Sequence, residues 1–154
     1  MAQIIVNNVQ KVFKTPGKDV IALKDINLEI KQGEFVCLLG PSGCGKSTLL
    51  NAVAGFALPS AGEISVEGRK ITGPGPDRGM VFQEYALFPW MTIAQNIAFG
   101  LEVQKKSKAE IDLTVNQLLD LLHLNDFRDR FPKDLSGGMR QRVAIARVLA
   151  LDSP

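Results

Sequence analysis

One segment of the chain combines residue types at the spacing that binds phosphate groups. Its first and sixth positions are glycines, and the second of these is followed by a lysine and a hydroxyl residue, which is the pattern G-x-x-x-x-G-K-[ST]. The segment reads Gly40-Pro41-Ser42-Gly43-Cys44-Gly45-Lys46-Ser47-Thr48. The four fixed positions recur by chance at on the order of one site in ten thousand. An ordinary glycine turn is therefore the weaker alternative.

Each residue type in this phosphate loop suits a triphosphate. The glycines allow several backbone N–H groups to converge on an anion, because they adopt torsions closed to other residues. Lys46 adds a full charge, and one such charge pair at about 4 Å contributes ~4 kcal/mol at an effective dielectric near 20, against at most ~2 kcal/mol for a helix N-terminus. The Ser47 hydroxyl is a hard oxygen ligand suited to Mg²⁺, and Thr48 is expected to support the α-phosphate side. The loop alone predicts a phosphate-binding NTPase or kinase.

The flanking sequence predicts the elements that must position this loop. Residues 34–39 form a short apolar run that ends at Gly40, as a strand buried on both faces would. Residues 47–54 are predicted to form a helix, with Gly55 available as its stop. The expected unit is therefore strand, glycine-rich loop, helix.

The rest of the chain separates into a β-rich half and a helical half. Segments 4–13 and 20–30 are rich in Val and Ile with partial alternation, which predicts an antiparallel pair of strands. Residues 63–66 predict a further strand, and residues 80–82 predict a second short buried strand. From Thr92 onward apolar residues recur at helical spacing, so this half is predicted to be mostly helical.

A second glycine-containing segment precedes a helical run. It reads Leu135-Ser136-Gly137-Gly138-Met139-Arg140-Gln141-Arg142. Ser136 can cap the helix, while Gly137 and Gly138 leave backbone N–H groups bare, which creates a second anion site at a helix N-terminus. A plain serine-capped helix start is the alternative.

The phosphate loop and this second segment together resemble the ATP-binding cassette (ABC) family, whose signature is an LSGGQ-type segment. Met139 stands where glutamine is commonest, a variant frequent in importer members. The resemblance covers essentially all 154 residues. It implies an α/β fold with a P-loop NTPase core sheet, an N-terminal antiparallel β region and a helical subdomain. The expected division is residues 1–84 for the β region and phosphate-loop core, 85–138 for the helical subdomain and signature loop, and 139–154 for the signature helix.

The resemblance also implies ligands and partners. ATP and Mg²⁺ are the expected ligands, with Lys46 and Gln83 in catalytic roles. A second ABC ATPase subunit is expected to bind head to tail, so that Ser136, Gly137 and Gly138 of one subunit close on the phosphate loop of the other.

Gln83 matches the glutamine loop of the family in residue and context. The resemblance implies that its amide contacts Mg²⁺ or its water, senses the nucleotide and links it to movement of the helical half; a solvated polar residue at a strand end is the alternative. An apolar cluster follows it and is either core or, by the resemblance, a groove for a helix of the membrane subunit: Leu87, Phe88, Trp90 and Met91. Phe13 is the candidate for stacking on adenine, with a core role as the alternative.

Several other residues are expected to have ordinary roles. His123 is predicted to be a surface or capping residue. The cysteines lack clustered metal-ligand neighbours and are predicted to be reduced thiols. Three arginines that follow the signature are predicted to be solvated or ion-paired: Arg140, Arg142 and Arg147.

Composition and charge exclude several classes of protein. Hydrophobic residues make up 45% of the chain and charged residues 22%, which is ordinary globular usage. A net charge of +2, from 18 basic and 16 acidic residues mixed along the chain, gives no support for nucleic acid as a partner. The amino terminus lacks the features of a signal peptide, and the longest uncharged stretch, 85–101, is interrupted by Pro89 and polar residues. Membrane contact is therefore expected only through a partner.

The segment 71–79, followed by residues 81–83, resembles the importers of nitrate, sulfonates, taurine and related anions. This implies transmembrane permease subunits, indirectly a solute-binding protein, and a peripheral place on the cytoplasmic face of a bacterial inner membrane. In the family the chain continues into a catalytic Glu and a later switch His, so a C-terminally truncated fragment that binds ATP with little turnover is expected. The alternatives are a non-hydrolysing ATP-binding regulator and a soluble ABC ATPase that acts on nucleic acid.

Overall fold

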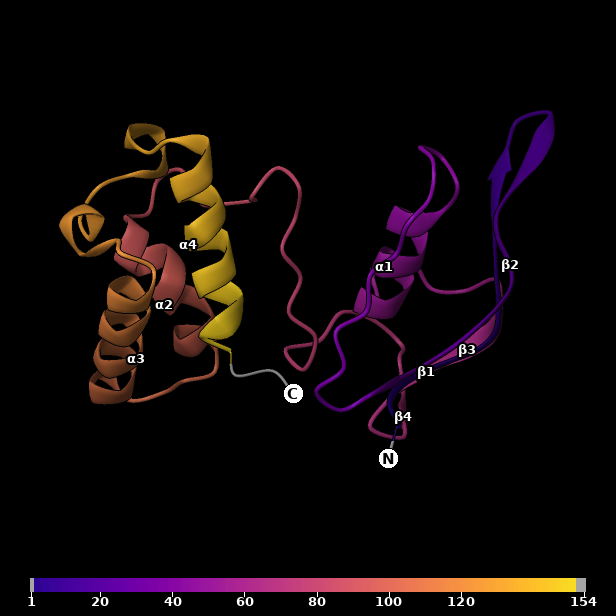
Figure 1. Cartoon of the computed structure of the whole chain (residues 1–154), viewed down its shortest axis with the longest axis horizontal. Coiled ribbons are helices and arrows are strands. Elements are labelled where there is room, and N and C mark those ends of the chain that lie inside the picture. Colours follow the sequence, from indigo (N-terminus) through magenta and orange to yellow (C-terminus); the bar gives the residue numbers. More distant parts are fainter. Residues whose placement is uncertain (1, 152–154) are drawn as a thin grey trace. The chain divides into compact units, whose positions relative to one another are not determined.

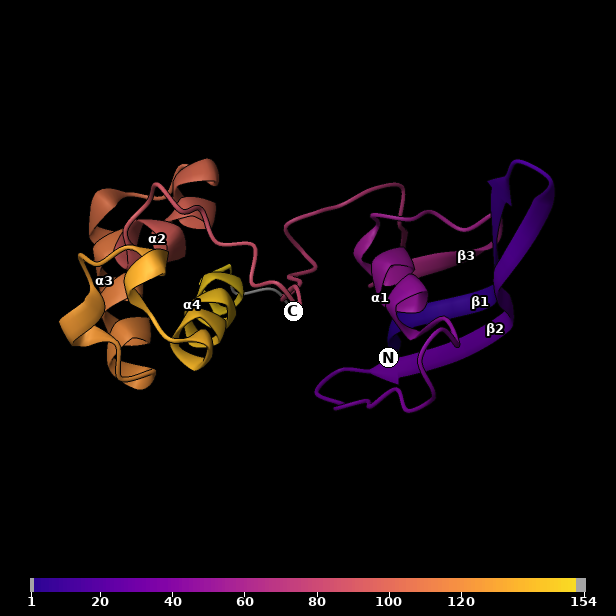
Figure 2. The same ribbon diagram turned by 90° about the horizontal axis from the view of Figure 1, so that it is seen from above.

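The computed structural model describes residues 2–151, with side chains from Ile4 onward, and divides into two compact units. The first unit runs up to Gly75 and the second begins at Pro76 (Figures 1 and 2). The domain boundaries expected at residues 84 and 138 stay predictions, and residues 152–154 of the expected signature-helix segment lie outside the described part of the chain.

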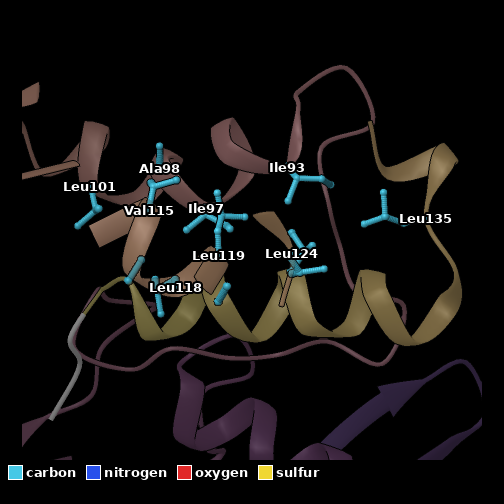
Figure 3. Packing of buried hydrophobic residues seen from close by; sticks show 12 residues of the cluster. Ile93, Ile97, Ala98, Leu101, Val115, Leu118, Leu119, Leu124 and Leu135 are labelled. Carbon is cyan, nitrogen blue, oxygen red and sulfur yellow. The ribbon is translucent and has the colours of Figure 1, made fainter. Parts of the chain in front are cut away.

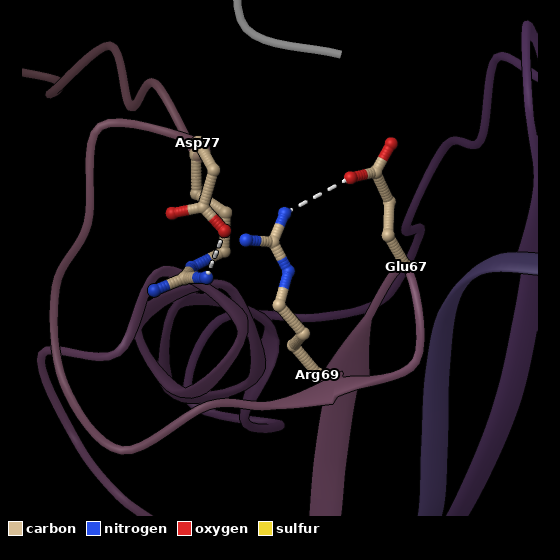
Figure 4. A network of polar contacts seen from close by, with 4 residues as sticks. Glu67, Arg69 and Asp77 are labelled. Atoms are coloured by element: carbon tan, nitrogen blue, oxygen red, sulfur yellow. Dashed lines mark hydrogen bonds and ion pairs between the residues drawn. The ribbon is translucent and has the colours of Figure 1, made fainter.

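The first unit is built on an antiparallel sheet with one helix. Its four strands lie in the order β2-β1-β3-β4. The elements are β1 (Ala2–Thr15), β2 (Lys18–Lys31), α1 (Lys46–Ala54), β3 (Ala61–Val66) and β4 (Arg69–Lys70). The predicted pair of strands and the later strand are thereby confirmed. Figure 4 includes the exposed ion pair at the β3–β4 turn, where Arg69 Nη2 lies 3.2 Å from Glu67 Oε2.

A register shift in β1 explains why the alternation in this segment is only partial. The shift lies between Val6 and Val9, where Asn8 has a φ of 48°. Because of the extra residue, Val6 and Val9 are both buried, although simple alternation would place them on opposite faces. Together with Ile64 of β3 and Leu49 of α1 they form the core under the helix.

Two of the expected strands do not form. Residues 34–40 have no regular structure, and Phe35 and Leu39 are 91% and 93% exposed. Residues 80–82 are also irregular, and Val81 is 40% exposed. A buried strand needs hydrogen-bonding neighbours, and within residues 2–151 no strand pairs with either segment. The predictions of buried strands here were wrong, because an apolar run identifies a strand only where partners are present.

The second unit is helical, as predicted. It contains α2 (Ile93–Val103), α3 (Lys108–Leu121), the 3₁₀ turns η1 (Asn125–Phe127) and η2 (Pro132–Asp134), and α4 (Gly137–Leu149). The first two helices begin with capping boxes, in which Thr92 and Ser107 accept bonds from Gln95 N and Glu110 N. His123 is exposed with a φ of 54° just after α3, which confirms its place at a helix end.

The helices of this unit enclose one apolar core (Figure 3). Residues at helical spacing point inward from α2 and α3, and the loops that follow α3 add two further leucines. The buried members include Ile93, Ile97, Leu101, Val115, Leu118, Leu119, Leu124, Leu135, Val143, Ala146 and Ala150. Helix α4 packs against α2 and contributes Val143 and Ala146 to this core, so apolar contacts help to fix its position.

Candidate functional site

The phosphate loop leads into the first turn of α1, as the sequence predicted. Gly45 occupies the N-cap position with a φ of 99° and no side-chain cap, and Leu49 N donates to Gly45 O at 2.9 Å. Residues 41–44 are exposed. The N–H groups in the first turn of α1 therefore adjoin an exposed glycine-rich loop. This geometry favours anion binding.

Gly45 also has a packing reason to be glycine. A Cβ atom at this position would lie 2.6 Å from Ala22 O and 3.2 Å from Leu23 Cδ2, both in β2. Contacts under 3.0 Å to a backbone oxygen force a shift of the backbone. The absence of a side chain at Gly45 thus allows the start of α1 to lie directly against β2, which sets the direction of the phosphate loop.

The ammonium group of Lys46 lies inside the loop. Its Nζ donates to Gly40 O and Pro41 O, each at 2.7 Å, and lies 3.6 Å from Cys44 Sγ. Ser47 is exposed and Thr48 is half-buried in the first turn of α1. The positive charge of Lys46 therefore lies among the carbonyl groups of the phosphate loop, where it is predicted to bind phosphate.

The signature segment starts α4. Ser136 is the N-cap, and its Oγ accepts from Met139 N at 3.3 Å, so the predicted cap is confirmed. Leu135 is buried and anchors the turn in the core, while Gly138 is exposed and has open space where a Cβ atom would lie. A role for Ser136, Gly137 and Gly138 in anion binding stays a prediction.

Gln83 lies in an irregular, exposed segment that then turns sharply. Tyr85 and Ala86 have φ angles of 62° and 48°. Tyr85 N donates to Phe82 O at 3.0 Å and Ala86 N donates to Glu84 O at 2.7 Å. The glutamine side chain is free of the core, and the backbone that follows it is fixed in a conformation that residues other than glycine adopt rarely.

Arg147 of α4 holds this turn. Its Nη1 donates to Ala86 O at 2.7 Å and its Nη2 donates to Tyr85 O at 3.3 Å. Burial lowers the pKa of Arg147. The expectation of a solvated or ion-paired arginine was therefore wrong here, because the residue flanks the buried face of α4 and meets carbonyl groups there. Arg142 likewise donates to a carbonyl, Leu122 O, at 2.9 Å.

Comparison with known proteins identifies the family. The sequence model described as ABC transporter matches residues 23–154. The chain belongs to the ABC transporter family. Its phosphate loop, glutamine loop and signature segment all lie inside the matched range.

Curated relatives in this family include importers of several anions. The nitrate import ATP-binding protein NrtD of Synechocystis is 52% identical over 145 residues, which are 94% of this chain and 54% of the relative. The taurine import ATP-binding protein TauB of Roseobacter denitrificans is 50% identical over 99% of this chain and 57% of the relative. The bicarbonate transport ATP-binding protein CmpC of Synechocystis is 53% identical over 96% of this chain and 23% of the relative. The chain thus spans about half the length, or less, of these relatives.

A solved structure in the same family confirms the fold. The ATP-binding cassette MJ0796, in a dimeric post-hydrolysis state bound to ADP and Pi, matches with a TM-score of 0.89 and 36% identity. The match covers 98% of this chain and 71% of that chain. The predicted α/β class is confirmed, although strands 34–39 and 80–82 of the expected core sheet are not formed in this chain.

The aromatic residues predicted to contact adenine or a membrane subunit are at least partly exposed. Phe13 in β1 is 43% exposed, with Lys11 Nζ 5.2 Å from its ring centre, so it is not a core residue. Adenine stacking by Phe13 stays a prediction. Trp90 is 69% exposed beside the half-buried Phe88, at a ring distance of 5.6 Å. The cluster after Gln83 is therefore neither a closed core nor a fully exposed patch.

Asn96 is a site-supporting residue that the sequence did not reveal. It is fully buried, accepts from Phe88 N at 2.8 Å, and donates to Phe88 O, Met91 O and Thr92 O at 3.0–3.1 Å. One side chain thus fixes the whole turn before α2. The available signal was a polar residue next to Ile97 on the apolar face of a predicted helix, where an unpaired amide would be costly.

The expected metal contacts fall in different units, Ser47 in the first and Gln83 in the second. Within residues 2–151, no cluster of three or more His, Cys, Asp or Glu side chains could hold a metal ion. A hydroxyl and an amide still suit Mg²⁺, because this ion takes most of its ligands from phosphates and water. Likewise, none of the helices in the described residues has the length and apolarity needed to span a bilayer.

Proposed function

We propose that this chain is the ATP-binding, energy-coupling part of a bacterial ABC importer for nitrate, a sulfonate, taurine or a related anion. The single observation that carries the proposal is the phosphate loop. It is open to solvent, starts a helix with no side-chain cap, and contains the ammonium group of Lys46. The importer role is supported by family membership and by relatives named for nitrate and taurine import.

The residues of the loop fit Mg-ATP. When bound, the nucleotide supplies the phosphoanhydride bond whose hydrolysis drives transport in the full-length protein. The amides of residues 43–48 and the Lys46 ammonium bind the phosphates, since Lys46 can exchange its two carbonyl contacts for stronger contacts with anionic oxygens. The Ser47 hydroxyl would be a ligand of Mg²⁺, the Gln83 amide would contact the ion or its water, and Phe13 offers an exposed ring for the base.

The proposed assembly contains two such chains head to tail, because the signature end of α4 is a second helix N-terminus whose first two residues are glycines. The dimeric cassette structures of the family support this arrangement. The chain is also proposed to bind transmembrane permease subunits at the cytoplasmic face of the inner membrane, and through them to serve a solute-binding protein.

The proposed substrate is a class of anions that includes nitrate, sulfonates and taurine. Relatives named for nitrate, taurine and bicarbonate are 50–53% identical to this chain. From these similar identities to relatives with different named substrates, we infer that this part of the protein does not select the anion.

The test is Mg-ATP binding by Lys46→Ala, with Lys70→Ala as the matched control. Both variants remove one lysine charge from the first unit, but Lys70 is paired with Glu63 in the sheet, at 3.3 Å. We expect Lys46→Ala to weaken binding by about 100-fold to 1,000-fold, since its charge contributes up to ~4 kcal/mol and each 1.4 kcal/mol is tenfold. Lys70→Ala should stay within twofold of the wild type. Equal affinities of the wild type and Lys46→Ala would refute the assignment.

A further inference from the structure

One arginine of α4 contacts the glutamine loop, which comprises residues 83–88, in three ways. Besides its two hydrogen bonds to Tyr85 O and Ala86 O, the Arg147 guanidinium lies 5.6 Å from the centre of the Phe88 ring. A planar guanidinium can donate to adjacent carbonyls in a fixed fork and stack on an aromatic face at the same time, which an ammonium cannot do. Arg147 therefore contacts both the backbone immediately after Gln83 and the aromatic ring that follows it.

The turn at Tyr85 and Ala86 is held by contacts from outside the turn. Tyr85 and Ala86 both have left-handed backbone conformations, which residues with side chains keep only where the surroundings hold them. The two carbonyl groups of this turn are the ones that accept from Arg147. These bonds add to the two hydrogen bonds within the turn, from Tyr85 N and Ala86 N, and tie the turn to α4.

Tyr85 also reaches the opposite end of α4. Its hydroxyl oxygen lies 3.4 Å from the point that a Cβ atom on Gly137 would occupy, and its ring lies 5.8 Å from the Arg140 guanidinium. One residue of the glutamine loop thus contacts the first turn of α4 with its side chain and the last turn with its carbonyl. A rigid helix joins the two contacts.

We propose that Arg147 is a positioning residue that couples the glutamine loop to the signature segment. Arg147 fixes Tyr85 and Ala86 on α4. When Gln83 moves, α4 therefore moves with it, and so does the end of the helix that carries Ser136. This inference rests on the proposed function, in which Gln83 responds to the nucleotide. The contacts that carry it all lie within the second unit.

The experiment compares Arg147→Met, Arg147→Lys and Arg142→Met in the full-length protein with its membrane partner. Methionine removes every donor at similar length, and lysine keeps the charge without the fork. Arg142 is the matched control, because it is also half-buried on α4 and donates to a carbonyl, Leu122 O, outside the glutamine loop. The readouts are hydrogen exchange of amides 83–88 and the kcat and KM of ATP hydrolysis.

We expect Arg147→Met to raise exchange at residues 83–88 at least tenfold and to lower kcat at least tenfold, with KM for ATP within twofold. Arg147→Lys should restore part of both losses, and Arg142→Met should leave both readouts within twofold. Equal losses in Arg147→Met and Arg142→Met, or unchanged kcat in Arg147→Met, would overturn the proposal. If Arg147→Met does not fold, wild-type kcat in Arg147→Lys overturns it and reduced kcat supports it.

Failure of the proposed function gives a different result. A wild-type protein that neither binds nor hydrolyses Mg-ATP would refute the nucleotide site. Exchange at residues 83–88 would still decide whether Arg147 positions the loop, since that measurement needs no nucleotide. Unchanged exchange in Arg147→Met would then overturn the positioning role as well.

Discussion

Replacing Gly45 by alanine should separate α1 from β2 and damage the phosphate loop. The residue has a φ of 99°, and the new Cβ would lie 2.6 Å from Ala22 O. Forcing a side chain into this backbone region costs about 1–2 kcal/mol. Overpacking against a backbone that must move costs about 1–3 kcal/mol more. We therefore expect Gly45→Ala to lower the free energy of unfolding by about 2–5 kcal/mol.

Gly17 offers a matched control in the same unit. It has a φ of 93°, close to that of Gly45, but a Cβ atom there would meet nothing within 4 Å. Gly17→Ala should therefore show the backbone cost alone, about 1–2 kcal/mol. The difference between the two variants isolates the contact of Gly45 with β2.

The assay is urea unfolding, monitored by circular dichroism. Mg-ATP binding is measured separately in the absence of urea. Gly45→Ala should unfold at lower urea than Gly17→Ala and should lose affinity, while Gly17→Ala should bind as the wild type does. A Gly45→Ala variant that is no less stable than Gly17→Ala would refute the close packing of α1 on β2. Wild-type affinity in Gly45→Ala would show that this packing does not set the loop.

Three further outcomes follow from the second unit. Ser136→Ala should lower the free energy of unfolding by about 1 kcal/mol through loss of the α4 cap; unchanged urea unfolding would contradict it. Asn96→Leu should lower it by about 3 kcal/mol, because part-buried backbone groups of the turn at Phe88 lose their partner; a difference below about 1 kcal/mol in the same assay would count against that role. Hydrogen bonds from the Ser107 hydroxyl and backbone lower the pKa of Glu110, so their stabilisation is present above the unfolded pKa of about 4.3 and is lost as pH falls through the folded value. In Ser107→Ala, NMR titration should find a higher Glu110 pKa than in the wild type, and an equal pKa would refute this account.

The start of each site helix was predictable because it depends on neighbours in sequence. Helix α1 begins at Lys46, one residue before its predicted start at Ser47, and Ser136 caps α4 as the local pattern predicted. A cap is a contact within three residues, so its signal is contained in a short window of sequence.

The strand predicted at residues 34–39 failed for the opposite reason. Its apolar composition is that of a buried strand, yet a strand forms only with partners, and none of the described segments pairs with it. Arg147 and Asn96 were missed for a related reason. The contacts of Arg147 join residues 61 and 62 positions apart. The only sequence signal was that each residue adjoins an apolar helical stripe, where polar groups need partners.

The two helix N-termini differ in ways that predict separate tasks. The start of α1 has no side-chain cap and includes Lys46, whereas Ser136 of α4 already uses the N–H group of Met139. A helix N-terminus alone contributes at most ~2 kcal/mol, while even a millimolar complex requires about 4 kcal/mol. The α4 end therefore cannot retain a phosphate by itself, and it can act only where another loop presents one. We accordingly expect Ser136→Ala to leave Mg-ATP binding by the single chain unchanged and to weaken ATP-dependent dimerisation of the full-length protein in sedimentation velocity. Loss of binding by the single chain would contradict this division.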